Sequence, residues 1–189
     1  MEIGLYFGSF NPIHHGHLII ANFILDHTKL EQVWFVVSPQ NPFKVSSSLL
    51  NEYHRLHLVR TAIEGERNLK ATDIEFHLPK PSYTIDTLAY LEEKYPQHSF
   101  SLIMGGDSFQ NLDKWKNADV IIKRYPIYIY NRPGFPVTPH NELQVIVNAP
   151  LLEISATYIR NCIKNGKSIR YMVPDVVKEE IEKSNYYKS

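Results

Sequence analysis

The first 27 residues join an apolar run, a turn and a helical segment, and this order constrains how the chain can fold. Residues 3–7 form an apolar, strand-like run. Gly8, Asn11 and Pro12 favour a turn, and residues 16–27 have the spacing of an amphipathic helix. A strand that turns directly into a helix points free backbone N–H groups and the positive helix end at one place. This unit predicts a phosphate site.

The rest of the chain alternates between strand-like and helical segments. Further strands are predicted at residues 32–38, 71–76, 100–104, 127–130 and 144–147. Helices are predicted at residues 51–64, 84–95, 156–165 and 175–184, with a loop at 41–48 and a turn at 132–134. Strands separated by helices favour βαβ units. We therefore expect a Rossmann-like, doubly wound α/β fold, whose mostly parallel sheet has helices on both faces and is followed by C-terminal helices.

Composition limits the partners of the chain. Its 189 residues suit one domain spanning 1–189, and 20 basic against 20 acidic residues leave no net field for a nucleic acid. Phosphate affinity must then be local. A single cysteine, Cys162, and the absence of a signal-like start predict a cytoplasmic protein, with Cys162 as a packing residue. No apolar run reaches the roughly 18–20 residues of a membrane span, and a homo-oligomer remains open.

Two histidines lie at the predicted start of the first helix. His14 and His17 are three residues apart, so both imidazoles face the same side and can reach one anion. Structural or solvent-facing histidines are the alternative interpretation. A metal site is disfavoured because no third ligand follows at a fixed spacing.

A second candidate anion site lies near the other end of the chain. Ser155 is a predicted N-cap, Thr157 lies in the first helical turn, and Arg160 follows one turn later. Two hydroxyls, free N–H groups and a guanidinium at one helix start suit a phosphate. The alternative is an ordinary cap followed by a surface arginine.

Together these segments resemble a nucleotidyltransferase family with the signatures G-x-F-x-P-x-H-x-G-H and I-S-x-T-x-[IV]-R. The first matches residues 8–17 and the second matches residues 154–160. Within that family, residues 81–87, 105–115 and 166–174 resemble the bacterial nicotinate-nucleotide adenylyltransferases. The resemblance covers essentially the whole chain.

The resemblance implies that ATP and nicotinate mononucleotide give the deamido dinucleotide and pyrophosphate, a step of NAD biosynthesis. It implies catalytic roles for His14, His17 and Arg160. Implied ATP-binding residues are Gly8, Ser9, Phe10, Lys44, Gly106, Asp107, Arg132, Ser155 and Thr157. Mg²⁺ would accompany ATP as a cofactor, and no residue is expected to hold a resident metal. A solvated loop lysine is the alternative for Lys44.

For the mononucleotide, the resemblance implies contacts from Ser82, Tyr83 and Thr84 and stacking of Trp115 on the pyridine ring. Without that context, a tryptophan in such a segment is more often a core residue. Asp86 is equally compatible with a ligand contact and with a first-turn acid that stabilises the helix end.

Two other functions remain open at this point. One is a related adenylyltransferase that prefers nicotinamide mononucleotide, because one or two polar contacts decide between acid and amide. The other is a non-catalytic nucleotide-binding protein, although binding alone would not need His14, His17 and Arg160 together.

Overall fold

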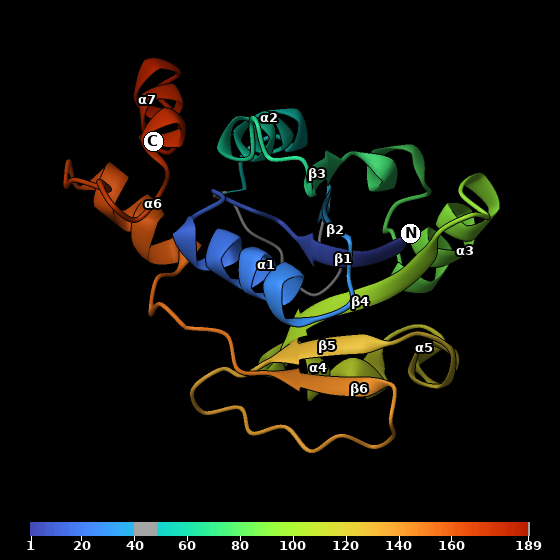
Figure 1. Ribbon diagram of the computed structural model, residues 1–189. Coiled ribbons are helices and arrows are strands. Elements are labelled where there is room, and N and C mark those ends of the chain that lie inside the picture. Colours follow the sequence, from blue (N-terminus) through green and yellow to red (C-terminus); the bar gives the residue numbers. More distant parts are fainter. Residues whose placement is uncertain (40–48, 189) are drawn as a thin grey trace.

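The structure is a computed structural model that describes residues 1–39 and 49–188, and its centre is a six-stranded parallel sheet. The strands are β1 (Glu2–Gly8), β2 (Gln32–Val37), β3 (Leu69–Thr72), β4 (Ser99–Gly105), β5 (Ile127–Tyr130) and β6 (Gln144–Val147). Their order is β3-β2-β1-β4-β5-β6, and every adjacent pair is parallel (Figure 1). The predicted parallel sheet is confirmed.

Helices cover both faces of the sheet, because side chains alternate between the faces along each strand. The helices are α1 (His15–His27), α2 (Glu52–Ala62), α3 (Thr84–Lys94), α4 (Gly106–Phe109), α5 (Ala118–Arg124), α6 (Ala156–Lys164) and α7 (Asp175–Lys183). Tyr6 and Phe35 share one apolar cluster with α1, α2, α6 and α7. Leu5 and Leu102 share the other with α3, α4 and α5. The predicted doubly wound, Rossmann-like architecture is therefore confirmed.

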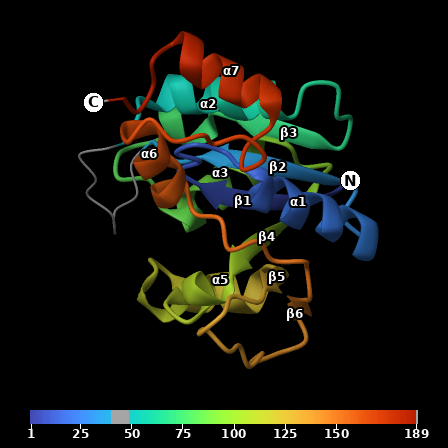
Figure 2. The same cartoon turned by 90° about the vertical axis from the view of Figure 1, so that its left-hand side faces the viewer.

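The C-terminal helices belong to the first of these layers. Helix α7 packs against α2 (Figure 2). The Tyr186 hydroxyl lies 2.8 Å from Nδ1 of His54 on α2. Cys162 on α6 is buried in the same cluster, as expected of a packing residue. Within the described residues, no helix is long and apolar enough to cross a membrane.

Two segments differ from the expectation. The strand predicted at 71–76 is wrong in its second half, because β3 ends at Thr72 and a 3₁₀ helix, η1 (Ile74–His77), follows. The Thr72 hydroxyl accepts the Ile74 amide at 3.3 Å, which turns the chain out of the sheet. The sequence patterns also missed α4, the 3₁₀ helix η2 (Leu112–Lys114) and α5, which are too short for a clear apolar period. The predicted loop at 41–48 lies outside the described residues.

The sheet order places a topological switch between β1 and β4. From this point the chain winds in opposite directions, and ligands of such sheets bind beyond the carboxyl ends of the strands. Gly8 is in register with Val37, and Gly105 with Tyr130, so these strands end at one edge. The Ser38 amide donates to the Gly8 carbonyl at 2.9 Å and joins the first two loops.

Candidate active site

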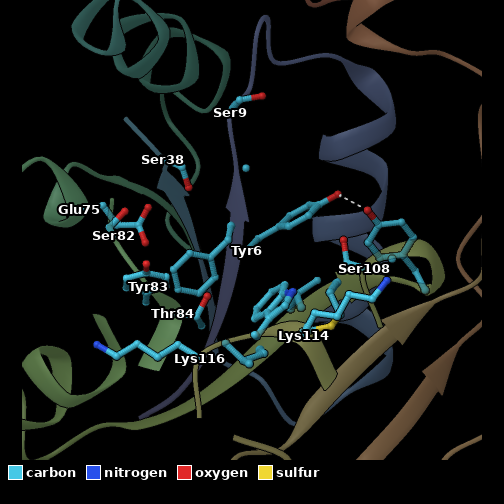
Figure 3. Close-up of a pocket in the computed structure, with 18 residues that line it drawn as sticks. Tyr6, Ser9, Ser38, Glu75, Ser82, Tyr83, Thr84, Ser108, Lys114 and Lys116 are labelled. Carbon is cyan, nitrogen blue, oxygen red and sulfur yellow. Dashed lines mark hydrogen bonds between the residues drawn. The ribbon is translucent and has the colours of Figure 1, made fainter. Parts of the chain in front are cut away.

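Two adjoining cavities lie at this edge of the sheet. The larger, of about 570 Å³, lies between the start of α1, the turn after β5 and the start of α6. The smaller, of about 180 Å³, lies between the ends of β1 and β4, the start of α3 and the segment around Trp115 (Figure 3). Tyr6, Ser9 and Tyr130 line both cavities. The two spaces therefore meet at these three side chains.

His14 and His17 line the larger cavity and are held against each other. His14 is the N-cap of α1, and its amide donates to Nδ1 of His17 at 3.3 Å. The two rings stack with centroids 3.7 Å apart. Because Nδ1 of His17 accepts a hydrogen bond, the proton of the neutral ring lies on Nε2. His17 can therefore donate from Nε2.

Burial keeps both imidazoles neutral. It lowers the pKa of His14 to about 4, with smaller contributions from the charges of His15 and Arg132. It also lowers the pKa of His17 well below its ordinary range, and His14 adds to that effect. Near neutral pH the pair is a fixed set of uncharged donors. Nδ1 of His14 is buried and has no hydrogen-bond partner among the described residues.

Helix α6 supplies charge and hydroxyls to the same cavity. The Ser155 hydroxyl accepts the Tyr158 amide at 3.1 Å, so the predicted N-cap is confirmed. Nη2 of Arg160 donates to the Thr157 hydroxyl at 3.2 Å, and Nη1 donates to the Asn11 carbonyl at 2.8 Å. Arg160 thus joins α6 to the loop after β1. The two sequence signatures come together in space.

The other residues expected to bind ATP lie around this junction. Gly8 lines the smaller cavity and Ser9 lines both, whereas Phe10 is buried with its ring 5.1 Å from that of His17. A Cβ atom at Gly8 would lie 2.8 Å from the Phe10 ring, so this position needs glycine. The Phe10 ring therefore packs against Gly8 and His17. Only the backbone of Phe10 could then contact a ligand.

An ion pair borders the larger cavity. Nη1 of Arg132 lies 2.7 Å from the Asp107 carboxylate, and Arg132 lines the cavity. Gly106 is the first residue of α4 and is buried; a Cβ atom there would lie 2.7 Å from the Phe135 carbonyl. Lys44 lies outside the described residues.

The residues expected to bind the mononucleotide line the smaller cavity, namely Ser82, Tyr83, Thr84 and Trp115. Tyr83 is the N-cap of α3, and its carbonyl accepts the amides of Asp86 and Thr87. No side chain within the described residues caps this helix, so its first amides remain for an acceptor in the cavity. Trp115 is half-buried beside them.

Asp86 has a partner that the sequence patterns did not suggest. Its carboxylate lies 2.8 Å from Nζ of Lys116, and the same ammonium lies 4.9 Å from the centre of the Tyr83 ring. Lys116 thereby joins the start of α3 to the segment after Trp115. This contact fits a first-turn acid that also orders one wall of the cavity.

Sequence reasoning missed Glu75, which lines the smaller cavity. The residue is 3% exposed. Its carboxylate accepts hydrogen bonds from the hydroxyls of Thr87, at 3.0 Å, and of Ser38 and Ser82. Burial raises the pKa of Glu75, and these hydroxyls oppose that rise. Glu75 fastens α3 to the end of β2. Its position depends on the 3₁₀ turn that the pattern did not predict.

Arg55 was also missed. Its side chain is fully buried, and its guanidinium donates to four carbonyls: Leu50 at 2.7 Å, Ser9 at 2.6 Å, Ser38 at 2.9 Å and Pro39 at 3.1 Å. One side chain therefore holds the loops after β1 and β2 together. The available signal was a charged residue four positions before Val59, on the apolar side of a predicted helix.

Comparisons with known proteins agree with this geometry. Residues 5–162 match the model of the cytidylyltransferase-like family. The chain is 53% identical, over 99% of its length and 98% of the relative, to the probable nicotinate-nucleotide adenylyltransferase of Cytophaga hutchinsonii. It is 49% identical to that of Flavobacterium psychrophilum over all of both chains. A structure of Plasmodium falciparum nicotinic acid mononucleotide adenylyltransferase complexed with NaAD shares the fold, with a TM-score of 0.83 at 21% identity over 98% of this chain and 97% of that chain. The chain belongs to the cytidylyltransferase-like family, and within it to the nicotinate-nucleotide adenylyltransferases.

Proposed function

We propose that this protein transfers the adenylyl group of ATP to nicotinate mononucleotide, giving deamido-NAD and pyrophosphate in cytoplasmic NAD biosynthesis. The observation that carries the proposal is the junction of the two cavities at Tyr6, Ser9 and Tyr130. A nucleotide in each cavity would bring two phosphates together there, beside His17. The names of the relatives at 53% and 49% identity support the same reaction.

ATP fits the larger cavity. Its phosphates would lie between the neutral His14–His17 pair and the start of α6, where Ser155, Thr157 and Arg160 offer hydroxyls and a fixed charge. The nucleoside would lie toward Asp107 and Arg132. Mg²⁺ would enter as part of the ATP substrate, held by its phosphate oxygens. Lys44, which follows β2, is proposed to join from its loop.

The lining of the smaller cavity suits the pyridine ring of nicotinate mononucleotide and its carboxylate. Trp115 offers an aromatic face for the pyridine ring, and the first amides and hydroxyl of α3, at Thr84, are donors for the ring carboxylate. Ser82 and Tyr83 complete this wall. The mononucleotide phosphate would then point to the junction with the larger cavity.

The residues suit direct in-line transfer. An oxygen of the mononucleotide phosphate, already ionised near neutral pH, attacks the α-phosphorus of ATP as the bond from that phosphorus to the bridging oxygen breaks. Pyrophosphate carries away the electron pair. No strong base is required, so the protein contributes alignment and donors aimed at the developing charge. A neutral Nε2–H of His17 is such a donor.

Pyrophosphate release from ATP with each candidate mononucleotide tests the function. We expect activity with nicotinate mononucleotide and a kcat/KM preference over the nicotinamide form on the order of 10²-fold, because the amide group would leave buried donors unpaired. Trp115→Ala should lower kcat/KM for both mononucleotides, because stacking on the ring is lost. Thr84→Val should reduce the difference in kcat/KM between the two mononucleotides. Equal values, or a preference for the amide, would overturn the nicotinate assignment. No pyrophosphate with any mononucleotide would overturn the transferase assignment.

A further inference from the structure

Two tyrosine hydroxyls meet where the cavities join. Tyr6 on β1 and Tyr130 at the end of β5 come from strands on either side of β4, and their hydroxyl oxygens are 3.2 Å apart (Figure 3). With Ser9, these are the residues that line both cavities. The pair therefore lies at the place where two bound nucleotides would approach each other.

The direction of the hydrogen bond leaves one proton available. Tyr6 donates to Tyr130, so the hydroxyl proton of Tyr130 is not used in this bond. Burial raises the pKa of both hydroxyls, so both remain protonated near neutral pH. Tyr130 can donate, and Tyr6 fixes the direction from which it does so.

The packing around the pair holds it in place. The Tyr6 ring contacts the rings of Phe10, Phe35 and His17, with centroids 5.8, 5.7 and 6.0 Å away, and is 3% exposed. Tyr130 is only partly buried, so its hydroxyl is reachable from the cavities. A Cβ atom at Gly105 would lie 3.1 Å from the Tyr130 ring, so a glycine leaves room for it.

We propose that the Tyr130 hydroxyl is a catalytic hydrogen-bond donor to the phosphate oxygens at the junction of the two cavities, and that Tyr6 is its positioning residue. The proposal rests on the proposed function. An uncharged donor at this point stabilises the charge that develops on the non-bridging oxygens during transfer, without repelling the nearby Arg132. It would act beside Nε2–H of His17, whose ring contacts Tyr6.

The direct test is Tyr130→Phe, which keeps the ring and removes the hydroxyl. We expect kcat to fall on the order of 10²-fold, with the KM values for ATP and nicotinate mononucleotide changed by less than about 3-fold. The matched control is Tyr128→Phe, which lies two residues earlier on the same strand and is 4% exposed but lines neither cavity. The control should keep the wild-type kcat.

Tyr6→Phe separates positioning from packing and keeps the test decisive if Tyr130→Phe does not fold. It should lower kcat by about 10-fold, and the double variant should be no slower than Tyr130→Phe alone, because the two hydroxyls act as one unit. Wild-type kcat in folded Tyr130→Phe, or in folded Tyr6→Phe, would overturn the proposal. An inactive wild-type enzyme would instead overturn the proposed function, so the two failures are distinguishable.

Discussion

The start of α1 and the start of α6 face the same cavity but offer a ligand different chemical groups. At α1 the groups are two stacked, neutral imidazoles, and His14 is 6% exposed. At α6 the groups are a guanidinium and two exposed hydroxyls, held by side-chain hydrogen bonds. The first region is uncharged and enclosed, and the second is charged and open.

This difference indicates a division of labour. Neutral donors fixed by packing raise kcat where their hydrogen bonds strengthen as charge shifts in the transition state. The half-buried guanidinium of Arg160 would attract the phosphates of bound ATP before and during the reaction. Changes at α1 should therefore lower kcat, and changes at α6 should mainly raise the KM for ATP.

The largest expected effect follows from His17→Ala. Loss of the Nε2–H donor should lower kcat at least about 10²-fold, with a smaller change in the KM for ATP. Steady-state kinetics with a melting curve for the same sample measures both. Near-normal kcat in a natively melting variant would remove the catalytic assignment of His17.

The second effect concerns stability and pH. The folded-state pKa of His14, about 4, lies below the ordinary 6.5, so the unfolded chain takes up the proton first as pH falls. The contribution of neutral His14 to the free energy of unfolding is therefore fully present above pH 6.5 and is lost as the pH falls from 6.5 to 4. Between pH 7 and pH 5 this loss is about 2 kcal/mol.

Urea unfolding of the wild type and of His14→Gln at both pH values measures this contribution. Because glutamine does not titrate, the variant should lose about 2 kcal/mol less than the wild type over this interval. Equal losses in the two proteins would show that His14 is not held neutral by burial.

The third effect concerns Arg160→Lys. An ammonium cannot bond the Asn11 carbonyl, the Thr157 hydroxyl and a phosphate with the fixed geometry of a guanidinium. We expect the KM for ATP to rise about 10-fold and kcat to fall less, with little change in melting temperature. Unchanged ATP kinetics would make Arg160 a residue that only links α6 to the first loop.

The sequence carried one kind of information about these regions and lacked another. Local patterns located His14, His17 and the Ser155 cap, because a helix start is recognisable within a few residues. The link from Arg160 to Asn11 spans 149 positions, and only the sheet order brings the two residues together. The neutral state of the histidines likewise results from tertiary burial, which a pattern of residues does not contain.

The residues that hold the loops were harder to find for the same reason. Arg55 donates to four backbone carbonyls. Because every residue has a carbonyl, the sequence does not show which four Arg55 contacts. Glu75 was placed in a predicted strand, where its side chain would have had different neighbours from those it has in η1. Candidate site residues that lie within a known signature were thus predictable. Arg55 and Glu75, whose partners come close only through the tertiary fold, were not.

The smallest expected effect tests the second region by separating its cap from its ligand contact. Ser155→Ala removes the hydroxyl that accepts the Tyr158 amide and should cost about 1 kcal/mol of stability together with a few-fold rise in the KM for ATP. Ser155→Asp restores a capping oxygen, so the free energy of unfolding measured in urea should return close to the wild-type value. Its negative charge would face the phosphates of ATP, however, and should raise the KM further than alanine does. If the aspartate variant bound ATP as well as the wild type, Ser155 would only cap the helix. The contribution of α6 to ATP binding would then come from the charge of Arg160.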